Sequence, residues 1–379
     1  MRSRSLLIVV ATALLGLGST SVAHACQCEG IPPEVSEPTS ASVPGLLAVR
    51  SFGPRGSLVA YDVASGRLQF ALPAGIASAN GSRYVVAVRG RGRTTLRLYS
   101  ARSGRYLGAR SRAGGWNLGA VSGNGRWIAL VRPRRGATQV ELLGLRRGQT
   151  HRFTLHGWFD VDAVANDGGR VFLIQYVTAG YLIRFYDLHR EQLATRVLTE
   201  RGKPMAGTAW GAVSSPDGRR VMTLYLRGDR LAEVHTLDLA RGSAVCIDLP
   251  RGKTSALRSY VLALGPDGRM LYAANPALGV VAIVDLRSLR VVRVARFHGR
   301  TDTDPTSRAA AVSYDGRTVY FASGRRLYAY DAAYGRVRGS YDAGGAVAGI
   351  TFGAGDRILR VVRRDGRSLR FDAATGSRR

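Results

Sequence analysis

Aromatic and charged side chains recur at one kind of position in this sequence, directly before short apolar segments with the composition of β-strands. Three of the four tryptophans stand there. Tryptophan faces suit sugar rings, flat apolar groups and cations, and neighbouring charges would orient a ligand. The alternative is that these tryptophans fill gaps between neighbouring structural repeats. The candidate binding residues are Trp116, Trp158, Asp160, Asp162, Trp210, Arg258, Tyr260, Asp302 and Asp304.

Residues with the spacing that catalysis or metal binding requires are absent from the sequence. The six histidines are scattered and form no H-x-x-x-H or H-E-x-x-H pattern. No G-x-S-x-G nucleophile motif occurs. The Asp-x-Asp pairs at 160–162 and 302–304 offer oxygen ligands but fall short of a calcium-binding loop. We therefore expect no cofactor and no metal site, and the sequence favours a binding protein over an enzyme.

The placement of these residues depends on a repeated unit that begins near Gly45. A polar turn with Asp-Gly or Asn-Gly, a basic residue and an apolar strand recur in that order; the glycines of successive turns lie 44 residues apart at Gly81 and Gly125, and 50 apart at Gly218 and Gly268. Asp-Gly and Asn-Gly tolerate positive φ and close tight hairpins. Units of four antiparallel strands at this period are typical of propeller blades. The sequence therefore predicts an all-β fold, a β-propeller of four-stranded antiparallel blades.

Residues 269–275 (RMLYAAN) and 280–286 (VVAIVDL) resemble a known repeat. They are similar to the Tyr-Val-Thr-Asn strand and the following Ile-Asp strand of YVTN-type propellers, which occur with WD-repeat-like propellers in bacterial exported proteins. The resemblance covers roughly residues 45–379 and is strongest in units five to seven; the third strands lack the Trp-Asp ending of the eukaryotic scaffold. It implies a β-propeller fold and no single activity, although YVTN-like folds include lactonases.

The number of blades follows from the innermost strands. Seven segments have the features of such a strand, the first near Ala77 and the last near Gly349. The first unit, Gly45 to Gly75, lacks a clear innermost strand, and the last unit stops before a fourth strand. A blade shared by the two ends of the chain would close the ring and cover exposed strand edges. We predict seven blades, with eight as the alternative, in one domain over residues 45–379.

The first 44 residues differ in composition from the repeats. Arg2 and Arg4 precede an uncharged apolar segment, and Ala23-His24-Ala25 fits a cleavage site, so residues 1–25 are predicted to be a signal peptide. Residues 26–44 are rich in Pro and Ser and predict a linker. No other segment is apolar enough to span a membrane. We expect a secreted or extracytoplasmic monomer, with a lipoprotein anchored at Cys26 as the alternative.

The three cysteines are Cys26, Cys28 and Cys246. In an oxidising compartment they allow one disulfide and leave one thiol. A bridge from Cys26 or Cys28 to Cys246 would tether the linker to the propeller.

The chain is strongly basic, with a formal net charge of +29. Such a charge would attract anionic polymers, phosphorylated envelope glycans or nucleic acid. The arginines are scattered over strand and turn positions, which favours a solvated basic surface over a dedicated polyanion site.

These observations give three functional hypotheses. The first is a binding or scaffold module for a protein, peptide or envelope glycan, because the loops that enter the innermost strands of a propeller gather at one mouth of its channel and loops on a rigid scaffold carry sites. The second is a hydrolase or lactonase-like enzyme at the same mouth. The third is polyanion binding by the arginine-rich surface.

Overall fold

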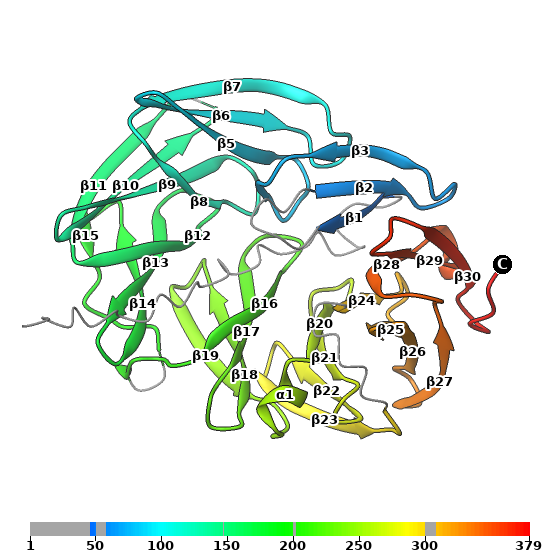
Figure 1. The fold of residues 1–379 in the computed structure, drawn as a ribbon. Coiled ribbons are helices and arrows are strands. Elements are labelled where there is room, and N and C mark those ends of the chain that lie inside the picture. The colour runs from blue at the N-terminus through cyan, green and yellow to red at the C-terminus, as the bar shows by residue number, and fades with distance from the viewer. Residues whose placement is uncertain (1–45, 51–57, 147, 200–201, 300–307) are drawn as a thin grey trace, which may run out of the picture.

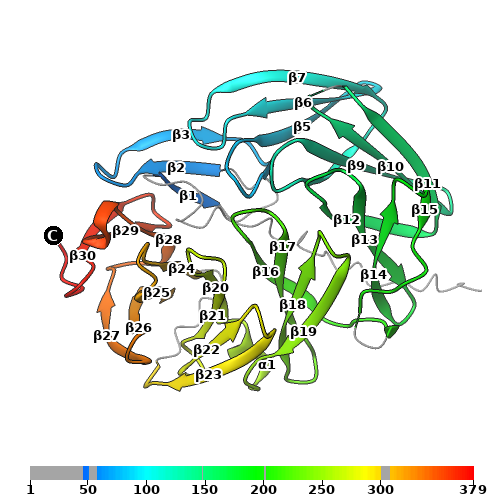
Figure 2. The same cartoon turned by 180° about the vertical axis from the view of Figure 1, so that it is seen from behind.

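The computed structural model describes residues 46–50, 58–146, 148–199, 202–299 and 308–379. In this part of the chain, successive strands pair antiparallel in eight separate sheets. The sheets are arranged around a central axis as the blades of a β-propeller (Figures 1 and 2). The predicted signal peptide and linker lie outside the described residues, as do Cys26 and Cys28.

Each blade is built from consecutive strands, numbered from the axis outward. Blade 1 consists of β1 (Leu46–Arg50), β2 (Leu58–Asp62) and β3 (Leu68–Leu72), and blade 2 of β4 (Ile76–Ala77), β5 (Tyr84–Gly90), β6 (Arg93–Tyr99) and β7 (Tyr106–Ala113). Blade 3 consists of β8 (Asn117–Val121), β9 (Trp127–Arg134), β10 (Ala137–Gly144) and β11 (Thr150–His156), and blade 4 of β12 (Trp158–Val164), β13 (Arg170–Val177), β14 (Gly180–Asp187) and β15 (Gln192–Leu193). Blade 5 consists of β16 (Thr208–Ser214), β17 (Arg220–Leu226), β18 (Ala232–Asp238) and β19 (Ser243–Asp248), and blade 6 of β20 (Val261–Leu264), β21 (Met270–Asn275), β22 (Val280–Asp285) and β23 (Arg290–Arg296). Blade 7 consists of β24 (Arg308–Val312), β25 (Thr318–Ser323), β26 (Arg326–Asp331) and β27 (Arg336–Asp342), and blade 8 of β28 (Val347–Phe352), β29 (Ile358–Arg363) and β30 (Ser368–Asp372).

The described residues include two short helical segments, the helix α1 (Thr254–Leu257) and the 3-10 helix η2 (Ala354–Asp356). Neither these nor any other described helix has the length and apolar character needed to cross a membrane.

The predicted turn phrase joins the first and second strands of the blades. In blade 5, Gly218 has φ +65°, which an L side chain rarely adopts. The Asp217 Oδ1 atom accepts hydrogen bonds from the Ser215 hydroxyl at 2.5 Å and the Arg219 amide at 3.0 Å. The Ser-x-Asp-Gly-Arg sequence therefore closes its own hairpin through local side-chain bonds.

The hydrophobic core is divided among the interfaces between blades. One cluster packs blades 3 and 4 together through side chains such as Val140 and Leu173, and another packs blades 5 and 6 through Leu224 and Leu271. Both faces of the middle strands are buried for this reason, and their sequences are nearly continuous apolar segments rather than alternating ones.

The ring closes between blade 1 and blade 8, which lie side by side in Figure 1. These are separate three-stranded sheets. Contrary to our expectation, the two ends of the chain therefore do not share a blade. The innermost strand that the first unit seemed to lack is β1, which contacts β28. Val63 packs with Val362 across the junction, and Arg360 donates to the Val63 carbonyl oxygen at 2.9 Å. The eight sheets correspond to the alternative of eight blades.

The propeller has two faces that differ in their connections. We call the side that carries the turns between first and second strands the turn face. The other side carries the loops that lead into each innermost strand and the turns between second and third strands, and we call it the entry-loop face. On this face lie the loops from which the candidate binding residues were chosen.

Candidate functional site

Two of the predicted binding residues are closed off from solvent. Trp116 is 0% exposed; its indole N–H donates to the Ala113 carbonyl at 2.9 Å, and the Arg132 guanidinium lies 4.3 Å from its ring centroid. Tyr260 is also 0% exposed and donates its hydroxyl to the Pro250 carbonyl at 3.0 Å. Both side chains fill gaps between neighbouring blades, which was the alternative to a binding role, and offer no surface to a ligand in this structure.

Trp210 occupies an intermediate position. It packs against the core between blades 5 and 6. Its indole N–H donates to the Arg258 carbonyl at 2.8 Å, and the Arg258 guanidinium lies 6.0 Å from its ring centroid. These contacts join blade 5 to the loop before blade 6. Asp302 and Asp304 lie outside the described residues.

Trp158 differs from the other tryptophans because it faces solvent at the start of β12. It is 63% exposed, and its cross-strand partner on β13, Tyr176, is 45% exposed. The Tyr176 hydroxyl donates to Asp160 Oδ2 at 3.2 Å. Burial of the carboxyl by the surrounding protein raises the pKa of Asp160, although the residue still reaches solvent. The hydrogen bond from Tyr176 opposes this rise. An aromatic pair with an oriented carboxylate is thus presented at the inner edge of blade 4.

Asp162 lies further along the same strand, at a β-bulge between Val161 and Ala163. Such a bulge inserts one extra residue and re-aims a side chain. The Asp162 Oδ1 atom is buried and has no hydrogen-bond partner among the described residues. Burial raises the pKa of this carboxyl to about 6. The carboxyl group is therefore poised to change its charge near neutral pH.

Blade 5 presents further buried polar groups to this side of blade 4. His235 on β18 is 2% exposed, and its Nε2 atom has no hydrogen-bond partner among the described residues. Burial lowers the pKa of His235 to about 4, so the ring is neutral at pH 7. The Tyr225 ring lies beside it at a tilt of 44°, with ring centroids 6.1 Å apart. Tyr225 also lies 5.7 Å from Tyr181 of blade 4, and burial raises the pKa of both hydroxyls.

The Tyr181 hydroxyl is the third polar atom of this group that makes no hydrogen bond of normal geometry within the described chain. Asp162 acts electrostatically on both tyrosines, which places the three side chains near one another between the blades. Unsatisfied buried polar atoms cost free energy, about 1–3 kcal/mol each. Their concentration at one junction is unusual for a region that only packs, and typical of a functional site.

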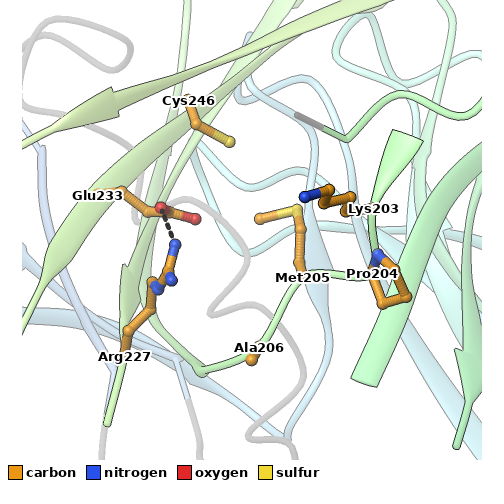
Figure 3. Close-up of a pocket in the computed structure, with 7 residues that line it drawn as sticks. All are labelled: Lys203, Pro204, Met205, Ala206, Arg227, Glu233 and Cys246. Carbon is orange, nitrogen blue, oxygen red and sulfur yellow. Dashed lines mark hydrogen bonds and ion pairs between the residues drawn. The ribbon is translucent and has the colours of Figure 1, made fainter. Parts of the chain in front are cut away.

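A cavity of about 260 Å³ opens between residues 203–206, which follow β15, and the outer strands of blade 5 (Figure 3). Met205 connects the cavity to the buried tyrosine pair, because its backbone pairs with that of Tyr181. Cys246 connects it to the histidine, since the two residues are cross-strand partners on β19 and β18. The residues that line the cavity are Lys203, Pro204, Met205, Ala206, Arg227, Glu233 and Cys246.

Opposite charges stand on the cavity wall. The Arg227 guanidinium bonds Glu233 at 3.4 Å and Asp229 at 2.9 Å, and these carboxylates raise the pKa of Arg227. Lys203 points into the same space from the other side (Figure 3). Next to them the apolar wall of Met205 and Ala206 gives the cavity a mixed character. It suits a small group with both polar and apolar parts, such as a side chain or one sugar ring.

The aromatic pair, the buried polar group and the cavity thus follow one another from the channel outward between blades 4 and 5. We call this the blade 4–5 junction.

Sequence reasoning found only part of this junction. Trp158, Asp160 and Asp162 were among the predicted residues, and the structure brings them to one strand. His235 and Tyr181 were not, because an isolated histidine in a strand has no motif. The available signal was the alternation of Glu233 and His235 with the apolar residues Ala232 and Val234 at the start of this strand. No group of three or more His, Cys, Asp or Glu residues in the described parts of the chain is arranged to hold a metal ion.

Comparison with known proteins supports the fold and a repeat of the β-propeller type. A family model described as outer membrane protein assembly factor BamB matches residues 279–379, from the end of blade 6 to the last residue. No curated protein matches the sequence. Among solved structures, the chain is similar to dihydro-heme d1 dehydrogenase NirN in complex with DHE, with a TM-score of 0.54 and 18% identity over 92% of this chain and 74% of that one.

A second similar structure is apo AztD from Citrobacter koseri, with a TM-score of 0.54 and 14% identity over 88% of this chain and 93% of that one. At these identities the likeness concerns the fold alone. The chain is thus a β-propeller repeat protein. The YVTN resemblance seen in residues 269–286 is a finer assignment that these matches do not test.

Proposed function

We propose that this protein is an exported binding or scaffold module that engages a protein, peptide or envelope glycan through its entry-loop face. The observation that carries the proposal is the exposed pair Trp158 and Tyr176 with Asp160 bonded to it, next to a cavity. Aromatic rings that remain exposed on a rigid strand contribute contact area without a large cost in conformational entropy. Location outside the cytoplasm rests on the predicted signal peptide and on the BamB-type match of the last blades.

The ligand contacts the blade 4–5 junction in two ways. A flat apolar or sugar surface lies on Trp158 and Tyr176, and a smaller polar group enters the cavity between Lys203 and Glu233. Pre-formed unsatisfied donors and acceptors favour a ligand that satisfies them, because each then gains a hydrogen bond without further desolvation.

The experiment is a binding screen of the full chain against envelope glycans and a displayed peptide library, followed by titration of the hits. Trp158→Ala is expected to weaken binding about tenfold or more, as loss of a central aromatic contact does. The matched control is Tyr334→Ala, because Tyr334 is 72% exposed on the turn face. Equal affinity of wild type and Trp158→Ala for every hit, with intact folding, would overturn the proposal.

A hydrolase or lactonase-like activity at the same junction is the second candidate. The observation in its favour is the raised pKa of Asp162, since a buried carboxyl that titrates near neutrality is typical of general acid–base groups. Turnover of lactone or ester substrates that Asp162→Asn abolishes, while binding persists, would favour this candidate over the binding module.

A further inference from the structure

Charge is distributed unevenly around the ring. Residues 76–156, which form blades 2 and 3, contain 16 arginines, one glutamate and no aspartate or lysine, a net charge of +15. Residues 157–379, nearly three times as long, contain 34 basic and 21 acidic residues, a net charge of +13. Blades 2 and 3 therefore form a basic sector.

The single glutamate of the sector does not reach the surface. Glu141 is 0% exposed and is bonded by Arg112 at 2.6 Å and Arg152 at 2.5 Å. Arg112 belongs to the outer strand of blade 2 and Arg152 to that of blade 3, so the buried carboxylate also joins the two blades. The solvent-facing side of the sector carries positive charge without an acidic neighbour from its own blades.

The chain connections gather part of this charge at the entry-loop face. Arg91 and Arg93 flank the β5–β6 turn, Arg134 and Arg135 flank the β9–β10 turn, and all four are exposed. Arg132 next to them has its pKa lowered by burial and by the positive charges of Arg134 and Arg152. Like charges held this close produce a strong local potential that a bound anion would relieve.

The basic sector ends directly at the aromatic pair of blade 4. The Gly157 amide donates to the Gly136 carbonyl at 2.9 Å, which holds the Arg134–Gly136 turn against the residue before Trp158. The arginines and Trp158 therefore lie on the same face of the propeller and on adjoining blades.

We propose that the entry-loop face of blades 2 and 3 binds the phosphate groups of a phosphorylated sugar polymer whose chain continues onto Trp158 and Tyr176. This inference rests on the proposed function and specifies its partner. Guanidinium groups bind phosphate oxygens in a bidentate manner, and aromatic faces bind sugar rings. A single-stranded nucleic acid fits less well because its bases stack on aromatics interleaved with the cations. Here the exposed aromatic pair stands at one end of the arginines, and Trp116 among them is buried.

The experiment measures binding of the full chain to a glycosylated poly(ribitol phosphate) as a function of salt concentration. The test variant is Arg91→Gln/Arg93→Gln/Arg134→Gln/Arg135→Gln. The control makes the same change of charge at four exposed arginines on the turn face of blades 5 to 8, in the variant Arg219→Gln/Arg269→Gln/Arg317→Gln/Arg357→Gln. Circular dichroism and thermal unfolding verify that both variants are folded.

The test variant is expected to bind the polymer about 10- to 100-fold more weakly at low salt and to reduce the slope of log K against log salt by roughly 2–3, since each phosphate contact on a flexible chain contributes about 0.7. The control variant is expected to retain the wild-type slope. Equal losses in the two variants would overturn the proposal, because net charge alone would then explain binding.

Two comparisons separate this inference from the proposed function. Single-stranded DNA that binds as tightly as the sugar polymer, with the same dependence on the four arginines, would overturn the assignment of the partner to a glycan. Loss of binding to screened ligands in Trp158→Ala, with no effect of the arginine variant on any of them, would leave the proposed function standing and overturn the role of the basic sector.

Discussion

The turn face and the blade 4–5 junction use their polar residues in opposite ways. On the turn face, polar turn residues bond from blade to blade. Asn166 accepts from the Asn124 amide at 2.8 Å and donates to the Asp217 carbonyl at 2.8 Å, which ties blades 3, 4 and 5 together. Asp356 similarly accepts the amides of Tyr314 and Asp315 at 2.8 and 2.9 Å.

At the blade 4–5 junction, buried polar atoms lack such bonds. Asp162 Oδ1, the Tyr181 hydroxyl and His235 Nε2 are the examples. This contrast indicates that the turn face stabilises the ring and that the junction gives up some stability for groups that a ligand can satisfy. Such a division is physically reasonable because unsatisfied groups are tolerated only on a scaffold held elsewhere.

The largest expected effect concerns the pH dependence of stability at the junction. Burial raises the pKa of Asp162 from 3.8 to about 6, so in this window the folded protein holds a proton that the unfolded chain has released, and stability falls as pH rises. Burial lowers the pKa of His235 from 6.5 to about 4, so here the unfolded chain holds the extra proton, and stability rises with pH. In the wild type the two slopes oppose each other and largely cancel.

Each single variant should expose the remaining slope. Asp162→Asn is expected to gain about 3 kcal/mol of stability between pH 4 and 6.5, and His235→Gln to lose about 3 kcal/mol between pH 4 and 6. Urea unfolding at half-unit pH steps measures both. Parallel profiles for the wild type and the two variants would show that these groups are not desolvated, and the contrast between the turn face and the junction would lose its main support.

A smaller effect compares a tightly packed turn glycine with a glycine at an open position in one entry loop. A Cβ added at Gly123 in the turn of blade 3 would lie 2.4 Å from Gly218 Cα in the turn of blade 5. Gly123→Ala is therefore expected to destabilise the protein by about 1–3 kcal/mol through overpacking. Gly115 on the entry-loop side has no atom within 4 Å of such a Cβ, so Gly115→Ala should stay within about 0.5 kcal/mol of wild type.

Thermal unfolding of the two alanine variants is the measurement. If Gly115→Ala lowered stability as much as Gly123→Ala, the close approach to Gly218 would not explain the loss at Gly123. Gly123→Ala should leave ligand binding unchanged, because Gly123 lies on the turn face.

The turn face was predictable from sequence, whereas the blade 4–5 junction was predictable only in part. The Ser-x-Asp-Gly-Arg phrase predicts its own hairpin because the bonds of Asp217 and Ser215 are local in sequence. The grouping of Asp162, Tyr181 and His235 depends on which faces of neighbouring blades meet, and on a bulge at Asp162 that shifts the register by one residue. The same argument explains why Trp116 and Trp158, at equivalent sequence positions, differ between full burial and 63% exposure.

The basic sector has a similar explanation. Along the chain the arginines are scattered over strands and turns, which favoured a merely solvated surface. In the fold, residues 91–93 and 134–135 come to one face because second-to-third strand turns always lie on the same side of a propeller. The signal that the sequence held was the absence of acidic residues between Asp62 and Glu141.

The smallest expected effect concerns a single exposed hydrogen bond at the mouth. Tyr176→Phe removes the donor to Asp160 Oδ2 while keeping the aromatic ring beside Trp158. The hydrogen bond lowers the pKa of Asp160, and the surrounding protein raises it, so the substitution should raise the pKa of Asp160 further. Stability should change by no more than about 0.5 kcal/mol because the bond is exposed to solvent.

Titration of the Asp160 carboxyl carbon by NMR measures the shift, with Tyr334→Phe on the turn face as the control. A pKa of Asp160 that falls or stays constant in Tyr176→Phe would show that this tyrosine does not orient the carboxylate, and the aromatic pair would then contribute contact surface alone.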